Sequence, residues 1–254
     1  MVRALVSPRT REPNMHASNL QPLFDGPVPQ TDDPVVLLEW ATTQFADSIA
    51  LSTSLGPQTL VLIDMLHKLG RSVPVFCIDT GLLFEETYAL WREVEAHYGI
   101  RIEGVSSRLT IEDQAARDGD RLWANAPDRC CAIRKVHPLR RRLLGMGAWI
   151  TGLRRDPASA TRHAVDGVEW DPVNGLFKIN PLWAWSAETV KAYAESHSIP
   201  LNPLLSQGYR SIGCTHCTAP SSGTDERSGR WSGNQKTECG LHWATPQASK
   251  ETSS

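Results

Sequence analysis

The sequence predicts an α/β protein with a wound, mostly parallel sheet and an irregular C-terminal arm. Along residues 34–201, short apolar runs of strand type alternate with segments of helical period. Such alternation is typical of βαβ units in a parallel sheet. From residue 202 onward Gly, Ser, Thr, Arg and Cys dominate and no core period is left. We therefore expect a nucleotide-binding α/β domain over 34–201 and a functional arm or lid over 202–243.

The expected strands are short apolar runs. SIALSTS (48–54) has the composition of a buried strand and ends in small polar residues, and SVPVFCID (72–79) ends in an aspartate. The other expected strands are IRIEGVS (100–106), AWITGL (148–153) and LFKINPL (176–182).

The expected helices have apolar residues at helical spacing. TLVLIDMLHKL (59–69) is strongly amphipathic, and FEETYALWREVEAHYG (84–99) closes on a glycine, which is a usual stop signal. SAETVKAYAESHS (186–198) begins with Ser186, a favourable N-cap residue. The remaining two are VVLLEWATTQF (35–45) and AIRKVHPLRRRLLGMG (132–147).

The composition excludes several classes of function. Hydrophobic residues make up 41% and charged residues 21% of the 254 residues, as in ordinary globular proteins. The net charge of −2 does not indicate bulk electrostatic binding of nucleic acid. No apolar run is long enough to span a bilayer, so we expect no membrane partner.

The two ends of the chain are expected to lie outside the folded core. Residues 1–33 carry no signal-peptide h-region and are broken by prolines, which predicts a flexible leader. Residues 244–254 are polar and are expected to form a disordered tail. A cytoplasmic location follows, where thiols stay reduced, so the six cysteines are better read as metal ligands or reactive groups than as disulfides.

A polar turn joins the first expected strand to the next helix. It carries Ser52, Thr53, Ser54 and Gly56. Hydroxyls and backbone N–H groups at the start of a helix can cradle a phosphate, but an ordinary N-cap with a turn glycine has the same appearance. Both interpretations stay open here. The turn lacks the lysine of a Walker P-loop.

A second polar turn follows the next strand and holds Asp79, Thr80 and Gly81. The carboxyl ends of neighbouring parallel strands share one ligand crevice, so the two turns together suggest a nucleotide lying across both. The alternative is that Asp79 simply caps the following helix.

Four cysteines form a candidate metal centre: Cys130, Cys131, Cys214 and Cys217. Four soft ligands select zinc or an iron–sulfur cluster. Directly adjacent cysteines suit a tetrahedral zinc site poorly, whereas a cubane takes one thiolate at each of four irons. The pattern therefore favours a [4Fe–4S] cluster, with zinc as the alternative. Cys77, among apolar neighbours in a strand, is expected in the core.

Cys239 is the remaining cysteine and lies in the hydrophilic arm. Arg227, Arg230, Lys236 and His242 are its basic neighbours in the sequence. Positive neighbours lower the pKa of a thiol and make it a nucleophile. A stray surface cysteine is the alternative.

These motifs together resemble the assimilatory enzymes adenylyl-sulfate (APS) reductase and phosphoadenylyl-sulfate (PAPS) reductase. The resemblance covers residues 35–243 and rests on the terminal Glu238–His242 motif ECGLH, on Cys130-Cys131 followed by Arg134-Lys135, and on Cys214-x-x-Cys217. It implies an adenine-nucleotide α-hydrolase-like fold. It also implies reduction of APS to sulfite and AMP through a cysteine S-sulfonate that thioredoxin resolves, since the four cluster cysteines resemble the APS-using branch.

The resemblance also implies roles for individual residues. Cys239 matches the catalytic cysteine, the turn of Ser52 to Gly56 would hold the phosphosulfate, and the turn of Asp79 to Gly81 would line the nucleotide crevice. The expected ligands of the substrate anion are Lys135, Arg162, Arg227, Arg230 and His242.

Three rival functions stay open. The first is PAPS reduction. The second is ATP-dependent tRNA thiolation on a similar fold, which is disfavoured because Gln58 stands where ATP-pyrophosphatases carry a magnesium-binding aspartate. The third is a non-catalytic, cluster-bearing nucleotide sensor, which would have no need of Cys239. The sequence leaves a homo-oligomer open as well.

Overall fold

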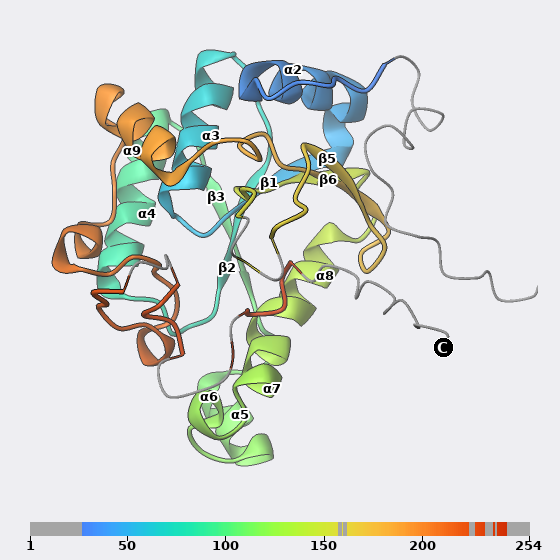
Figure 1. Ribbon diagram of the computed structural model, residues 1–254. Helices are drawn as coiled ribbons and strands as arrows, with labels where there is room; N and C mark the ends of the chain where they lie inside the picture. The colour runs from blue at the N-terminus through green and yellow to red at the C-terminus, as the bar shows by residue number, and fades with distance from the viewer. Residues whose placement is uncertain are drawn as a thin grey trace, which may run out of the picture.

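The computed structural model describes residues 27–156, 159, 162–223, 227–231, 236 and 238–242. In this part of the chain the strands form one six-stranded sheet in the order β3-β2-β1-β4-β6-β5 (Figure 1). Every pairing is parallel except that between β5 and β6. The strands are β1 Ile49–Thr53, β2 Val75–Asp79, β3 Ile102–Ser106, β4 Ala148–Ile150, β5 Val168–Asp171 and β6 Leu176–Ile179. The prediction of a wound, mostly parallel α/β sheet is confirmed.

The helices begin and end at recognisable signals. Asp33 caps the first with a 2.8 Å bond from the Val35 amide, Thr110 closes a capping box, and Gly99 ends α4 with a φ of 62°. The α-helices are α2 Pro34–Phe45, α3 Pro57–Lys68, α4 Glu85–Tyr98, α5 Ile111–Asp118, α6 Leu122–Asn125, α7 Pro127–Cys131, α8 His137–Leu143 and α9 Ala187–Ser196. A π-helical turn, Ala132–Val136, joins α7 to α8, and 3₁₀ turns lie at Ala46–Ser48, Pro203–Gln207 and Thr215–Cys217.

The order of the strands places a switch point between β1 and β4. From β1 the chain runs outward through β2 to β3, then returns to pair β4 on the other side of β1. Loops therefore leave β1 and β4 in opposite directions, which opens a crevice at their carboxyl ends. This crevice is where ligands bind in open α/β sheets.

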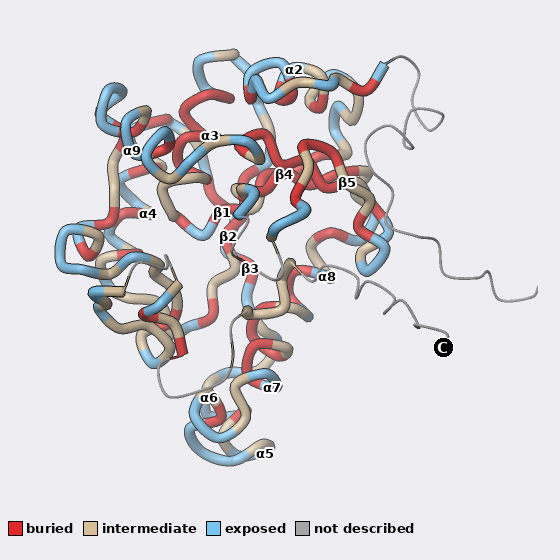
Figure 2. The backbone as a smooth tube through the Cα atoms, in the orientation of Figure 1, coloured by how far each residue is buried: buried red, intermediate tan, exposed pale blue. Residues whose placement is uncertain are grey.

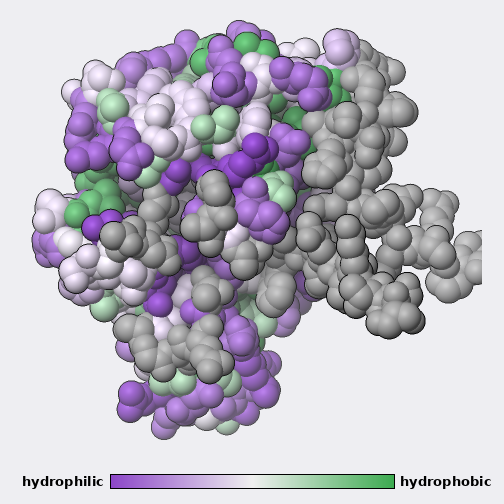
Figure 3. All heavy atoms as spheres, in the orientation of Figure 1, coloured by the Kyte–Doolittle hydropathy of each residue, from purple (hydrophilic) through white to green (hydrophobic). Residues whose placement is uncertain are grey.

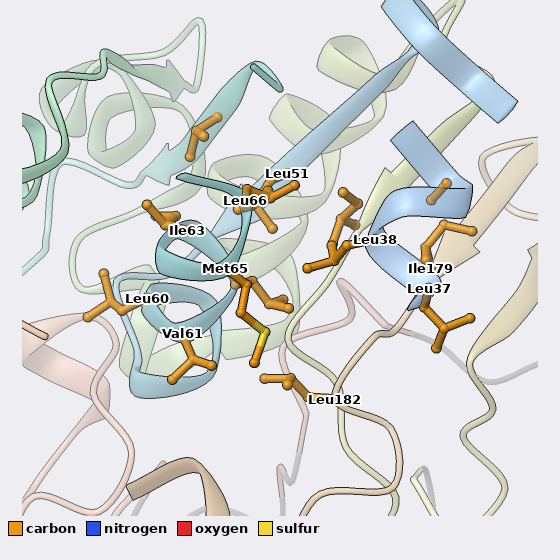
Figure 4. Close-up of a cluster of buried hydrophobic side chains, with 14 of the residues drawn as sticks. Leu37, Leu38, Leu51, Leu60, Val61, Ile63, Met65, Leu66, Ile179 and Leu182 are labelled. Carbon is orange, nitrogen blue, oxygen red and sulfur yellow. The ribbon is translucent and has the colours of Figure 1, made fainter. Parts of the chain in front are cut away.

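Two apolar cores cover the two faces of the sheet. Alternate residues of β1 divide between them: Ile49 and Leu51 face the larger core, while Ala50 faces the smaller one. The larger core packs the sheet against α2, α3, α4 and α9, and Figure 4 shows the part built by α2, α3 and the strands. The smaller core receives Leu139 and Leu143 of α8. Figure 2 accordingly shows buried backbone along the strands and along α3, which has eight buried residues.

A small lobe formed by α5, α6 and α7 extends from the sheet (Figure 1). Leu122, Cys130 and Ile133 form its apolar cluster. Its outer surface is mainly hydrophilic in Figure 3, whereas the hydrophobic spheres at the top of that view lie over α2.

The structure differs from the expected elements in several places, among them the short helix α6, which was not expected. The helix expected over 132–147 ends at Leu143 and is preceded by α7 and the π-helical turn. Helix α5 was missed because it is eight residues long, its one large apolar residue is Ile111, and its only buried residue is Gln114. Strand β5 was missed because it is a four-residue hairpin arm, stabilised by pairing to β6 rather than by its own pattern.

The ends of the chain lie mostly outside the described residues, namely 1–26 of the expected leader and all of the expected tail 244–254. Residues 27–33 pack on the domain, where Val28 is buried and the Thr31 carbonyl accepts a bond from Trp183 Nε1. Among the described helices we find none with the length and apolar character needed to cross a bilayer.

Candidate active site

A cleft of about 710 Å³ opens at the carboxyl ends of β1, β2 and β4. It lies at the switch point of the sheet, and both the arm and the turns after the strands line it. The expected site residues in its lining are Ser52, Thr53, Ser54, Gly56, Thr80, Lys135, Arg162, Arg227, Arg230, Cys239 and His242. Asp79 and Gly81 are described residues that do not belong to this lining. The structure thus brings together side chains that are as much as 190 positions apart in the sequence.

The turn after β1 presents the start of α3 to the cleft. Thr53 organises it, because its hydroxyl lies 2.8 Å from that of Thr59 and accepts a 2.9 Å bond from the Leu55 amide. Leu55 takes a left-handed φ of 56° to make the turn. No side chain caps α3, Pro57 has no N–H, and the Thr59 amide donates to the Gly56 carbonyl at 3.0 Å. Of the first three helical residues, Gln58 is therefore the one that can offer its amide to an anion. The turn thus offers hydroxyl groups and one helical amide at the cleft.

The turn after β2 is organised by Asp79. Its carboxylate accepts a 2.7 Å bond from the Tyr88 hydroxyl and a 2.9 Å bond from the Gly81 amide. Burial and this carboxylate together raise the pKa of Tyr88. Gly81 has a φ of 70°, which glycine adopts without strain. Asp79 therefore shapes the loop, and α4 begins later, with Phe84 at its N-cap.

Lys135 is the most deeply placed cation of the cleft, with 9% of its surface exposed. Burial lowers the pKa of its ammonium group, but the nearby thiols of Cys214, Cys239 and Cys131 outweigh burial and raise the pKa overall. A cation surrounded by thiols in a cleft can neutralise both a bound anion and a thiolate.

Arg230 is held at the edge of the cleft by the arm. Its Nε donates to the Cys217 carbonyl and its Nη1 to Ser211 Oγ, both at 3.3 Å. Its guanidinium also lies over the Trp231 ring at 4.5 Å. These contacts join residues 227–231 to the Cys214–Cys217 turn.

Arg162 and Arg227 share the carboxylate of Glu238. Arg162 Nη2 lies 3.0 Å from Oε1, and Arg227 Nη2 lies 3.2 Å from Oε2. The Arg162 contact also includes a 3.1 Å hydrogen bond from Nε. Burial lowers the pKa of Arg227 and the Glu238 charge opposes this effect. The triad leaves one net positive charge at the cleft wall.

The four candidate metal-ligand cysteines gather where the lobe meets the arm. Cys130, Cys131 and Cys214 are buried, and Cys217 is partly buried. Burial raises the pKa of Cys130, and the thiols of Cys214 and Cys217 raise it further, so charges on these groups are close enough to interact. Burial likewise raises the pKa of Cys131 to about 11.

The Cys214–Cys217 turn is anchored to the turn after β2. Cys214 forms an isolated bridge with Leu83, and its Sγ lies 3.3 Å from Thr80 Oγ1. His216 of the same turn packs against Trp123 of α6, with 4.1 Å between ring centroids and 37° between the ring planes. The cysteines therefore lie at the junction of the lobe, the arm and the sheet.

The segment that carries Cys239 docks on the sheet. Gly240 has a φ of 84° and turns the chain, so that Leu241 packs against the smaller core. His242 stacks on Trp149 with 5.3 Å between centroids and 14° between planes. Burial lowers the pKa of His242 well below 6.5, and Lys178 and Arg162 lower it further. His242 is therefore neutral when docked.

Three contributors to the site were missed in the sequence. Glu238 belongs to the terminal motif, but its two arginine partners are invisible without the fold. Trp149 was read as an ordinary strand residue, and no local signal marks it as the platform of His242. Arg134 was noted only as part of the motif that follows Cys130-Cys131 and was given no role, yet it is buried and donates to the Thr80 carbonyl at 3.2 Å. The sequence gives no signal that this arginine is buried, so its burial is seen only in the structure.

Comparisons with known proteins agree on one family. A family profile described as phosphoadenosine phosphosulfate reductase domain matches residues 48–220. An adenosine 5′-phosphosulfate reductase of Salinibacter ruber is 44% identical over 82% of this chain and 83% of its own length. The crystal structure of a phosphoadenylyl-sulfate (PAPS) reductase from Candida auris, a phosphate complex, superposes with a TM-score of 0.67 and 33% identity, covering 80% of this chain and 96% of that one.

The fold is shared more widely. Yeast FAD synthetase, in complex with FAD, superposes with a TM-score of 0.50 at 18% identity, over 74% of this chain and 65% of its own. At that identity the likeness concerns the fold alone, which agrees with the adenine-nucleotide α-hydrolase-like sheet expected from the sequence.

Proposed function

Because this chain belongs to the phosphoadenosine phosphosulfate reductase family, we propose that it reduces adenosine 5′-phosphosulfate to sulfite and AMP, with Cys239 as the nucleophile. One observation carries the proposal. Cys239 lines the same cleft as the turn after β1 and the four expected cations Lys135, Arg162, Arg227 and Arg230. A thiol in that position would face a phosphosulfate bound in the cleft.

The first step is attack of the Cys239 thiolate on the sulfur of the substrate. The S–O bond to the phosphate breaks, AMP leaves with the electron pair, and Cys239 carries a sulfonate. Negative oxygens around the sulfur repel a thiolate, so the step needs cations. Lys135, Arg162 and Arg227 line the cleft and would neutralise those oxygens. The Gln58 amide and the hydroxyl groups of Ser52 and Ser54 at the carboxyl end of β1 would hold the phosphate.

The second step is reductive release of sulfite. A thiolate of reduced thioredoxin attacks the sulfur of Cys239, sulfite leaves, and a mixed disulfide forms. The second thioredoxin thiol then attacks this disulfide, which restores the Cys239 thiol and leaves oxidised thioredoxin. The two electrons come from the thioredoxin dithiol, which is kept reduced in the cytoplasm. Residues 238–242 must undock for this step, because Cys239 is only partly exposed when they are docked.

The donor set of four cysteines supports a [4Fe–4S] cluster in this site. Cys130 and Cys131 from α7 and Cys214 and Cys217 from the arm would hold it, and Thr80 would hydrogen-bond to Cys214. Among the described residues no three cysteine, histidine or carboxylate side chains converge on the position of a single ion. The ligands of a cubane bind four separate irons. When bound, the cluster would supply a covalent cross-link between the lobe and the arm.

A second candidate function is PAPS reduction, which the likeness to the Candida auris enzyme favours. The two substrates differ by a 3′-phosphate and share the phosphosulfate chemistry. Steady-state rates with APS and with PAPS on the same preparation separate them.

The central test uses protein purified without oxygen. Iron and sulfide are measured, and the protein is incubated with APS labelled in its sulfate sulfur. We expect a brown protein whose chain retains the label until a dithiol is added. Cys239→Ser is expected to stay brown and take no label, whereas Cys214→Ser is expected to lose its colour.

Cys77→Ser serves as the matched control for loss of a thiol outside the four-cysteine group and the arm, because Cys77 belongs to the larger core and borders the floor of the cleft with only 2% of its surface exposed. It is expected to keep both the colour and the label. Labelling of Cys239→Ser to the wild-type level would disprove the proposed mechanism.

A further inference from the structure

Glu238 directly precedes Cys239 and connects two arginines of the cleft. Its side chain is 17% exposed, and those of Arg162 and Arg227 are 21% and 22% exposed. The ion pairs are therefore largely shielded from water, where such pairs are stronger than on an open surface. One peptide bond joins the residue that carries this shielded carboxylate to the residue that carries the nucleophile.

The carboxylate contacts the arginines without entering the cleft. Arg162, Arg227 and Cys239 line the cleft, whereas Glu238 does not belong to its lining. Glu238 thus contacts both guanidinium groups from the side that faces away from the cleft. A carboxylate that merely occupied the anion site would instead face the cleft itself.

Cys239 is also held from its other side. Gly240 turns the chain, Leu241 packs on the smaller core and His242 stacks on Trp149. The apolar attachment of residues 241–242 and the ionic attachment of Glu238 flank the cysteine. On the N-terminal side, the next described attachment beyond Glu238 is the ion pair of Lys236 with Asp128, so loss of the Glu238 contact lengthens the span of chain that is free to move before Cys239.

We propose that Glu238 is a positioning residue, which fixes Cys239 relative to the two arginines that bind the substrate anion. This inference rests on the proposed function for the identity of that anion. The two ion pairs of Glu238 fix the position of the Cys239 thiol relative to the guanidinium groups that bind the substrate oxygens, so that the thiol lies in line with the substrate sulfur. A displacement of the thiol by about 1 Å from this position can reduce the rate about 10²-fold.

The test compares Glu238→Gln with wild type and with Glu103→Gln in the cluster-loaded, full-length protein. The glutamine keeps the shape and removes the charge. Glu103 is a suitable control, because it also pairs with an arginine, Arg142 at 2.6 Å, but lies on β3 outside the cleft lining. Iron content and thermal unfolding establish that each variant is folded.

The first measurement is single-turnover formation of the Cys239 S-sulfonate from APS. For Glu238→Gln we expect the rate at saturating APS to fall about 10- to 100-fold, while the APS concentration for half-saturation does not rise. A role in binding alone would raise the half-saturating concentration and leave the saturated rate unchanged. For Glu103→Gln both values are expected to match wild type.

The second measurement needs no APS chemistry. Alkylation of Cys239 by neutral iodoacetamide is followed by mass spectrometry across a range of pH. The plateau rate at high pH, where the thiolate is fully formed, reports access to the sulfur rather than its charge. We expect the plateau to rise at least about 5-fold in Glu238→Gln, since breaking a buried ion pair shifts a docking equilibrium by more than this factor. A double variant with Arg162→Gln should show no further rise, because the two residues act through one contact.

The two measurements test the proposed function and the positioning role of Glu238 separately. If wild type forms no S-sulfonate but the plateau rises as expected, the proposed function fails and the positioning of Cys239 by Glu238 stands. If wild type is active and Glu238→Gln matches it in both measurements, the inference is overturned and the function stands. A faster single-turnover rate with an unchanged plateau would also overturn it, because Glu238 would then be a competitor of the substrate.

Discussion

Gly213→Ala is predicted to disable the site by moving one arginine. The glycine lies beside Cys214, and the guanidinium of Arg230 packs where its side chain would be. An added Cβ would lie 2.7 Å from Arg230 Cζ and 3.0 Å from Nη1. The φ of Gly213 is outside the left-handed region, so the backbone itself accepts alanine.

The size of the effect follows from these distances. Carbon atoms in contact lie about 3.5–4.0 Å apart, so the guanidinium must move by about 1 Å. It gives up two hydrogen bonds that are both 3.3 Å long, which should cost less than about 2 kcal/mol of folding free energy because bonds of this kind contribute about 1 kcal/mol each. The loss of one aligned cation at the reacting group is larger, about 10²-fold in rate. We therefore expect a folded variant with kcat/KM for APS reduced about 10²-fold.

The assay is thioredoxin-dependent sulfite release from APS, with thermal unfolding measured in parallel. Arg230→Ala gives the effect of losing the cation outright, and the double variant should match it, because the methyl group acts only through Arg230. Gly104→Ala on β3 is the control, since its Cβ would meet Trp91 at an ordinary 3.4 Å. Wild-type kinetics in Gly213→Ala, or additive effects in the double variant, would refute the reasoning.

Three further predictions test the surroundings of the cleft. Because docking lowers the pKa of His242 below its usual 6.5, only the undocked segment takes up a proton there. Docking should thus be constant above about pH 6.5 and weaken as the pH falls below it, seen as a rise in thiolate-corrected alkylation of Cys239 that His242→Gln abolishes. Cys77, whose pKa burial raises to about 12, should resist alkylation until urea unfolds the protein. Gly152→Ala would place a Cβ 2.8 Å from Thr59 Cγ2 and 3.0 Å from Gln58 Cβ, so we expect weaker AMP binding by titration and a loss of about 1–3 kcal/mol in urea unfolding.

The parts of the fold that were predicted have strong local signals. The run 48–54 and the amphipathic run 59–69 identify β1 and α3, because a buried parallel strand is apolar throughout and a helix on a sheet shows one apolar stripe. The loop between them could be placed for the same reason. Helix α5 and strand β5 have no such pattern, and their positions depend on the elements that they contact.

The site was predictable as a set of residue types and not as a geometry. Motif spacing pointed to Cys239 and to the arginines, since nucleophiles and cations have distinctive chemistry. It could not reveal that Asp79 bonds to Tyr88, or that Glu238 reaches Arg162 across 76 positions. Such pairings are set by the relative placement of sheet, loop and arm.

The π-helical turn Ala132–Val136 explains how the thiols and the cleft come to be neighbours. Successive residues of an α-helix point about 100° apart, so three in a row are rarely all buried on one surface. Here Ile133, Arg134 and Lys135 are all buried, each against a different part of the molecule. Ile133 packs in the lobe, Arg134 donates to the carbonyls of the turns after β2 and β3, and Lys135 lines the cleft.

The turn is therefore the point at which lobe, sheet and cleft are joined, and π-helical turns often occur at functional sites. Cys130 and Cys131 end the helix that leads into it. Lys135 lies one helical turn after Cys131, so a displacement of these cysteines would also shift Lys135. Substitution of Cys130 should accordingly affect anion binding in the cleft as well as the metal content, whereas a cluster that only stabilised the lobe would leave the affinity for AMP unchanged.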